Sequence, residues 1–152
     1  MSIFPTKILL ATDGSEEAEL ATTTAADLAK STDSELDVIY VLEVDPWHYP
    51  SREHVKHPER YEDLKDESRM IRDRHVEKIE ASVGSVSNTH LATGPPAKQI
   101  VAYAQDQGVG LIVMGSRGQG GIRRALMGSV SDEVVRHAHC PVMVVRPEKQ
   151  DS

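Results

Sequence analysis

Short apolar runs alternate with amphipathic stretches along the whole chain. Apolar runs typical of buried strands lie at residues 7–12, 36–44, 86–92, 109–114 and 142–145. Between them, apolar residues recur at helical spacing, in 18–28, 61–79, 97–104 and 129–138. This alternation runs without interruption through residues 1–152 and predicts one α/β domain with a mainly parallel sheet. Alternation alone leaves the strand order open.

Residues that favour turns and helix ends punctuate these elements. Asp13 or Ser15 is expected to cap the first helix, and Pro95-Pro96 to open the helix that Gly108 ends. Residues 46–58 contain three prolines, three histidines and the only tryptophan, so they are expected to form a loop. Residues 148–152 are expected to form a frayed, disordered tail.

Charge and cysteine content narrow the function classes. A formal net charge of −7 argues against a nucleic-acid-binding protein, which needs a basic face. Cys140 is the only cysteine, so an internal disulfide is impossible and a reducing compartment is favoured. The apolar run Ile8–Ala11 is too short for a signal peptide, and no run is long enough for a transmembrane helix. The expectation is a cytoplasmic protein without nucleic-acid or membrane partners.

The most informative stretch runs from Gly115 to Ser131, between an apolar run and a predicted helix. Glycines let backbone amides approach a ligand closely. Ser129 and Ser131 fall where the helix begins, with its unpaired N–H groups and positive dipole end. Three arginines lie in the same stretch: Arg117, Arg123 and Arg124. Arg123 and Arg124 are better interpreted as solvated loop charges. The glycines, the helix start and Arg117 together predict a binding site for nucleotide phosphates.

Two better-known phosphate motifs do not fit. A Walker loop ends in Gly-Lys-Ser/Thr, whereas Gly128 is followed directly by Ser129. A dinucleotide fingerprint would follow the first strand, where the chain has Asp13-Gly14-Ser15-Glu16 instead.

Asp13 is a further candidate for the ligand site. If the first and fourth strands are neighbours, Asp13 faces the glycine-rich stretch Gly115–Ser131. There it could accept from ribose hydroxyls or help to hold a divalent cation such as Mg²⁺.

Histidines near the single cysteine raise the question of a metal site. His137 and His139 are two residues apart and do not share a helix face. A buried small thiol at a helix end is therefore the better interpretation of Cys140. The histidines of the 46–58 loop give no better case, and no protein metal site is expected.

Four segments in order resemble the universal stress protein family, in particular its ATP-binding branch. That family's pattern is Gly-x2-Gly-x9-Gly-Ser/Thr, which appears here as Gly115, Gly118, Gly128 and Ser129 with every spacing intact. The flanking segments agree as well: Asp13-Gly14-Ser15, Gly94-Pro95-Pro96-Ala97, and Arg136 to Val142. The resemblance covers nearly the whole chain and is weakest over residues 46–58.

The resemblance implies a fold, an assembly and a set of binding residues. The fold would be a single open five-stranded parallel sheet of order 3-2-1-4-5, with helices on both faces. The chain would form a homodimer through Val142–Val145, a strand that is otherwise a sticky edge. Asp13 would meet the ribose and Val41 the adenine. The remaining nucleotide-binding residues would be Ala11, Thr12, Met114, Gly115, Arg117, Gly118, Gly128, Ser129 and Val130, with Ser131 close by.

The function implied is a dimeric stress-response and signalling module that binds ATP, with Mg²⁺ accompanying the nucleotide. No Asp or Glu lies between Gly115 and Ser131 to act as a base, so efficient hydrolysis is not indicated. Position 117, often histidine in relatives, is an arginine that can serve a phosphate equally well. Three alternatives stay open: a nucleotide-independent dimeric scaffold, a slow ATPase, and an enzyme related to the adenine-nucleotide α-hydrolases. The last lacks its expected Ser-Gly-Gly-x-Asp-Ser loop after the first strand.

Overall fold

A computed structural model describes residues 2–13, 18–42, 70, 73–74, 77, 80–81, 86–93, 95–116 and 128–146. The predicted loop at 46–58, the apolar stripe at 61–79 apart from isolated helical positions, and the tail at 148–152 fall outside these residues. None of the helices in the described part of the chain is long and apolar enough to span a membrane.

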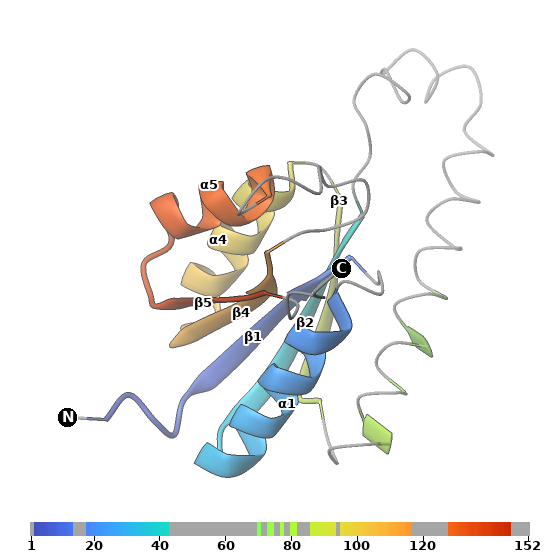
Figure 1. Ribbon diagram of the computed structural model, residues 1–152, viewed down its shortest axis with the longest axis vertical. Coiled ribbons are helices and arrows are strands. Elements are labelled where there is room, and N and C mark those ends of the chain that lie inside the picture. Colours follow the sequence, from blue (N-terminus) through green and yellow to red (C-terminus); the bar gives the residue numbers. More distant parts are fainter. Residues whose placement is uncertain are drawn as a thin grey trace, which may run out of the picture.

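The described strands form one parallel sheet in the order β3-β2-β1-β4-β5. Its strands are β1 (Lys7–Thr12), β2 (Glu35–Leu42), β3 (Asn88–Thr93), β4 (Leu111–Gly115) and β5 (Val142–Val145). The helices are α1 (Glu19–Thr32), α4 (Pro96–Asp106) and α5 (Ser129–His137). Figure 1 shows α4 and α5 together on one face of the sheet and α1 on the other. The predicted fold class and strand order are confirmed.

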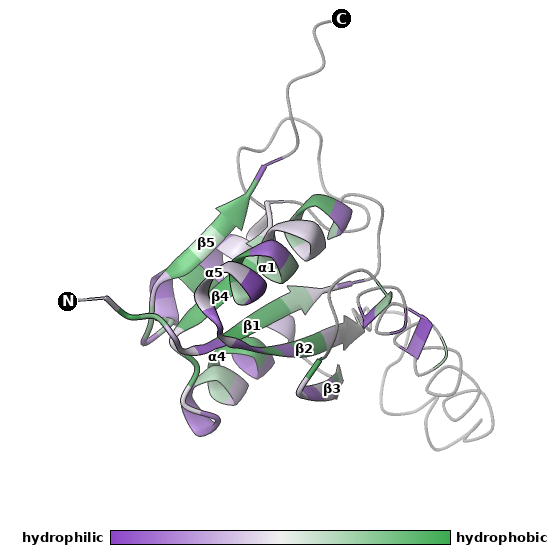
Figure 2. Cartoon of the chain, turned by 90° about the horizontal axis from the view of Figure 1, so that it is seen from below, coloured by the Kyte–Doolittle hydropathy of each residue, from purple (hydrophilic) through white to green (hydrophobic). Residues whose placement is uncertain are grey.

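Two apolar layers hold the helices to the sheet, because alternate residues of each strand point to opposite faces. On one face, Leu9, Ile39 and Ile112 pack with Ile100 of α4 and Val134 of α5. On the other face, three alanines of α1 pack on aliphatic side chains of the strands. The alanines are Ala21, Ala25 and Ala29, and the strand residues are Ile8, Leu10, Val38 and Val113. Figure 2 shows that the strands are mostly apolar, whereas the helices carry both polar and apolar residues.

The small side chains of its alanines let α1 pack closely on the sheet, and threonine and serine residues lie on the rest of its surface. Several hydroxyls on this helix donate to the carbonyl four residues earlier, as Thr24 Oγ1 does to Leu20 O at 2.7 Å. Such bonds satisfy polar side chains without drawing them away from the helix. The small residues of α1 therefore let it pack close to the sheet between β1 and β2, with its hydroxyl groups hydrogen-bonded to its own main chain.

The predicted cap of α1 is wrong. The helix begins at Glu19 with Ala18 as N-cap, and no side chain caps it. Asp13 follows β1, which ends at Thr12, and lies six positions before the helix; the acidic residue of the first turn is Glu19. The helix starts where its buried alanines start, since Ala18 and Ala21 are both buried against the rest of the fold.

Candidate functional site

The sheet reverses its order between β1 and β4, and this is where ligands bind in open α/β sheets. These two strands pair in parallel, with Ala11 opposite Met114. Thr12 and Met114 are buried at the carboxyl ends of their strands, whereas Asp13 is half-buried directly beyond β1. The structure thus brings together Ala11, Thr12, Asp13, Met114 and Gly115 at one edge.

The amino end of α5 contributes backbone donors. Gly128 is the N-cap with φ −70° and ψ 162°, and no side chain caps the helix. Its carbonyl accepts the N–H of Asp132 at 3.0 Å. The N–H groups of Ser129, Val130 and Ser131 have no hydrogen-bond acceptor among the residues that the structure describes. Three amides at the positive end of a helix dipole can receive an anion.

Short hydrogen bonds hold this helix end against β4. Gly128 N–H donates to the carbonyl of Ser116 at 2.6 Å, and Ser116 N–H donates to that of Val145 at 2.9 Å. Ser116 and Gly128, which are separated by eleven residues in the sequence, are therefore adjacent in space. The sequence pattern did not single out Ser116, because its contribution comes from main-chain groups that every residue carries. Its place inside the glycine motif is the only signal that could have marked it.

Of the other predicted site residues, Arg117 and Gly118 are not described by the structure, whereas the backbone of Val41 is. Arg117 and Gly118, together with Arg123 and Arg124, lie outside the described residues. Val41 pairs with Ala92 near the carboxyl end of β2, one strand away from β1. Its backbone is thus on the same edge of the sheet as Thr12.

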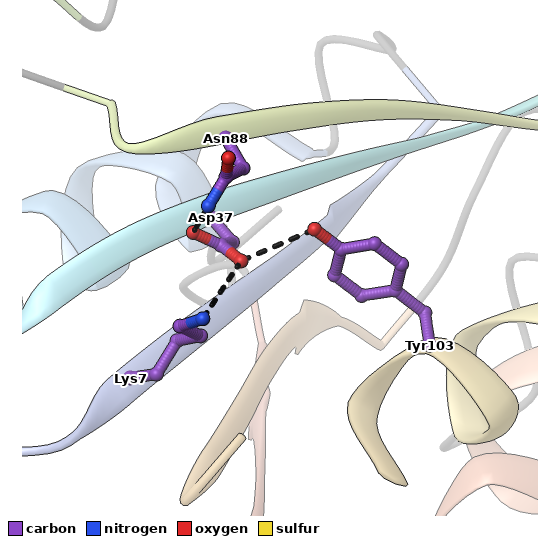
Figure 3. A network of polar contacts seen from close by, with 4 residues as sticks. All are labelled: Lys7, Asp37, Asn88 and Tyr103. Carbon is purple, nitrogen blue, oxygen red and sulfur yellow. Dashed lines mark hydrogen bonds and ion pairs between the residues drawn. The ribbon is translucent and has the colours of Figure 1, made fainter. Parts of the chain in front are cut away.

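A second polar cluster lies at the opposite, amino-terminal part of the sheet (Figure 3). Asp37 of β2 is fully buried, and its carboxylate accepts from Tyr103 Oη of α4 at 3.1 Å. Asn88 Nδ2 of β3 donates to the same carboxylate at 3.3 Å. Lys7 Nζ of β1 lies 3.9 Å from it as an ion pair. The carboxylate of Asp37 is therefore supplied with donors from three other elements.

This amino-edge network (Lys7, Asp37, Asn88 and Tyr103) has a chemical consequence for the phenol. Burial, the charge of Asp37 and the hydrogen bond to Asp37 raise the pKa of Tyr103 to about 12. The ring also stacks on His90, with centroids 5.1 Å apart. Tyr103 is therefore a neutral donor at physiological pH, fixed in place on both its hydroxyl and its face.

The histidines beside Cys140 do not form a metal site in the described residues. No group of three or more His, Cys, Asp or Glu side chains that could hold an ion is found within them. Cys140 is half-buried, and burial raises the pKa of its thiol. A protonated thiol is a poor metal ligand and a poor nucleophile, so Cys140 serves as a small apolar residue packed against the α4–α5 core.

Sequence comparison assigns this arrangement to a family. The model of the universal stress protein family matches residues 5–146. The chain belongs to the universal stress protein family. The match extends from just before β1 to just after β5, so it includes every described strand and helix.

Individual universal stress proteins agree with this assignment. Universal stress protein MJ0531 of Methanocaldococcus jannaschii is 36% identical over 154 aligned residues, covering 95% of this chain and 84% of the relative. The solved structure of hypothetical protein MJ0577 superposes with a TM-score of 0.77 at 28% identity, covering 97% of this chain and 100% of the other. A universal stress protein in complex with cAMP shares the fold, with a TM-score of 0.67, 19% identity, and coverage of 95% and 99%.

Proposed function

We propose that this chain binds ATP at the carboxyl edge of β1 and β4, as a member of the ATP-binding branch of its family. The whole of residues 1–152 would act as one nucleotide-binding domain. The proposed nucleotide-binding residues are Ala11, Thr12, Asp13, Val41, Met114, Gly115, Arg117, Gly118, Gly128, Ser129, Val130 and Ser131. A universal stress protein of the same fold has been solved in complex with cAMP, which makes adenine nucleotides the first ligands to test.

The observation that carries the proposal is the position of the first three amides of α5, which have no acceptor among the described residues. They lie at the strand-order reversal, where Asp13 is half-buried directly after β1. An uncapped helix end is costly when nothing satisfies its donors. Phosphate oxygens would satisfy all three, and the ribose hydroxyls would then be within the reach of a carboxylate at the neighbouring strand.

Gly128 supports close approach of a ligand for a specific reason. Its φ of −70° and ψ of 162° are extended values that any residue adopts, so backbone conformation does not require glycine here. What glycine provides at this N-cap is the absence of a side chain next to the amides of Ser129 and Val130. A bulky side chain at position 128 would occupy the space through which a phosphate reaches them.

Mg²⁺ would enter with the nucleotide rather than bind to the protein alone. Asp13 is the one carboxylate proposed to help hold it, and a divalent cation of this kind usually keeps several waters and takes phosphate oxygens as ligands. A single protein carboxylate fits that role and is insufficient for a metal-only site. ATP binding is therefore expected to depend on Asp13 more strongly in the presence of Mg²⁺ than without it.

Dimerisation through β5 completes the proposal. β5 pairs only with β4 among the described strands, and Met143 on it is 37% exposed. A second copy would pair its own β5 with this edge and cover the apolar side chains. The assembly would act in the cytoplasm as a stress-response and signalling module, with protein partners that recognise the nucleotide-bound form.

Binding without efficient turnover is the activity that the residues favour. Between Gly115 and Ser131 the sequence has no Asp or Glu to orient a water at the γ-phosphate. The nearest carboxylate beyond it, Asp132, is 3.2 Å from Arg136 Nε on the next turn of α5 and points along the helix surface. Phosphate release slower than about one per second is expected, well below typical enzyme turnover.

Isothermal titration calorimetry with ATP, ADP and AMP in the presence of Mg²⁺ tests the proposal. The wild type is expected to bind ATP, and Gly128→Val is expected to bind at least about 100-fold more weakly, the loss of two amide contacts to a charged ligand. Ala102→Val is the matched control, since Ala102 is exposed on α4 away from this edge. Absence of binding by the wild type at millimolar nucleotide would leave the nucleotide-independent dimeric scaffold as the function.

A further inference from the structure

Ser131 differs from the other polar residues at the start of α5, because its hydroxyl is turned into the protein. The residue is 2% exposed. Its Oγ donates to the carbonyl of Gly128 at 3.0 Å and lies 3.4 Å from the carbonyl of Ser116. Ser129, two positions earlier, is exposed, and its hydroxyl has no hydrogen-bond partner within the described part of the chain.

The hydrogen-bond capacity of Ser131 decides what it can do for a phosphate. A serine hydroxyl carries one proton, and here both candidate acceptors of that proton are main-chain carbonyls. A donor already shared between two carbonyls has no proton left for an anion. Its remaining lone pairs would repel phosphate oxygens, so the hydroxyl itself is unsuited to contact the nucleotide.

The two carbonyls that Ser131 joins belong to Ser116, directly after β4, and to Gly128, the N-cap of α5. Gly128 N–H also donates to Ser116 O at 2.6 Å. Ser116 is itself tied to β5 through its N–H and Val145 O. Ser131 thus adds a buried hydroxyl where the residue after β4, the start of α5 and the end of β5 are joined by hydrogen bonds.

We propose that Ser131 is a positioning residue for the nucleotide site: its hydroxyl clasps Ser116 and Gly128 together, and so orients the amides of Ser129 and Val130. This inference rests on the proposed function for its ligand. It assigns to Ser131 a role through the backbone, whereas Ser129 keeps a hydroxyl that can reach the phosphates. The clasp is made by groups of the chain alone, so we expect it to be present without nucleotide as well.

Two readouts on three variants test the clasp. Amide hydrogen exchange by NMR without nucleotide follows the N–H of Gly128, and calorimetry follows ATP affinity. Ser131→Ala is expected to speed exchange at Gly128 and to weaken ATP binding, each by about tenfold, the worth of one hydrogen bond. Ser131→Thr should restore both, because a helical threonine readily bonds to the carbonyl three residues earlier. Ser129→Ala should weaken ATP binding and leave exchange at Gly128 unchanged.

Exchange at Ile112 distinguishes a local effect from general destabilisation. Its N–H donates to Pro141 O at 3.0 Å, at the far end of the same β4–β5 pairing, and should exchange at the wild-type rate in Ser131→Ala. Should Ser131→Ala not fold, Ser131→Cys keeps the volume with a weaker donor and allows the same comparison.

Three results would overturn the inference. The first is weaker ATP binding by Ser131→Ala with unchanged exchange at Gly128, which would make the hydroxyl a direct ligand. The second is no change in either readout. The third is equally faster exchange at Gly128 and Ile112, which would reduce the role to general stability. If the wild type binds no nucleotide, the proposed function fails, whereas the exchange measurements still decide whether the clasp exists.

Discussion

The two ends of the sheet treat polar groups in opposite ways. At the amino-terminal part, the buried carboxylate of Asp37 receives Tyr103, Asn88 and Lys7 from α4, β3 and β1. At the carboxyl edge, the first amides of α5 have no acceptor among the described residues. Both are polar clusters in one small fold, but only the first has its partners among the described residues, and for the second we propose a nucleotide as the partner.

This difference separates groups that stabilise the fold from groups that bind a ligand. A buried charge is tolerated when its hydrogen bonds are made within the protein, and removing one partner then costs stability. Donors left unsatisfied at an edge lower stability until an anion arrives, which then stabilises the folded state. Mutations at the amino-edge network should therefore change stability alone, and mutations at the carboxyl edge should change ligand binding.

The largest expected effect is that of Asp37→Ala. The variant leaves Tyr103, Asn88 and Lys7 without their shared acceptor and opens a cavity under α4, so it should lose about 3 kcal/mol of unfolding free energy. Urea unfolding measures this loss, and calorimetry on the folded variant should give the wild-type ATP affinity. A large loss of ATP affinity together with wild-type stability would contradict the separation of a stabilising network from a ligand-binding edge.

Ligand stabilisation is the next largest effect and applies to the carboxyl edge. ATP at 100 times its dissociation constant should raise the unfolding free energy of the wild type by about 2.7 kcal/mol. At the same ATP concentration Gly128→Val should gain at most about 0.4 kcal/mol, and Asp37→Asn should show the full increase from a lower starting value. Chemical denaturation with and without Mg-ATP provides the measurement. An equal response by Gly128→Val would contradict the proposed position of the phosphates.

Tyr103→Phe is expected to have a smaller effect on stability. The phenol donates one hydrogen bond to a carboxylate that keeps two other partners, so its loss should cost about 1.5 kcal/mol. The stacking with His90 remains possible for phenylalanine. Wild-type stability for this variant would mean that the hydrogen bond to Asp37 has no net value.

A pH titration refines the same comparison. The pKa of Tyr103 is raised to about 12 in the folded chain from the ordinary value of 10.0. The unfolded chain therefore loses the phenol proton first, and the stabilisation that is complete below pH 10 is lost as the pH rises from about 10 to 12. The stability difference between wild type and Tyr103→Phe should shrink across this range. A difference that stays constant from pH 9 to 12 would contradict the raised pKa.

Much of the fold was predictable because its signals are local. The apolar runs at 7–12 and 142–145 coincide with β1 and β5, and Pro96 opens α4 as proline at a first helical position should. The start of α1 was not predictable in this way. Asp13 and Ser15 are good capping residues, but the helix starts at Glu19, because the packing of its alanines on the sheet decides where it begins.

The site was predictable in part, for a physical reason. Glycine spacing and helix-start serines identify an anion site, because both act through the local backbone. The amino-edge network was missed, since Asp37 sits inside the apolar run of β2 and its partners come from distant parts of the chain. Likewise, the sequence treats Ser129 and Ser131 alike, and only packing reveals that one is exposed and the other buried.

An NMR titration of the ¹⁵N-labelled chain with Mg-ATP tests the central claim most directly, because it observes both ends of the sheet in one experiment. The account predicts that the amide signals of Gly115, Ser129, Val130 and Ser131 shift with ATP, while those of Asp37, Asn88 and Tyr103 stay in place. Shifts confined to the amino-terminal part of the sheet, or no shifts anywhere at millimolar ATP, would contradict it.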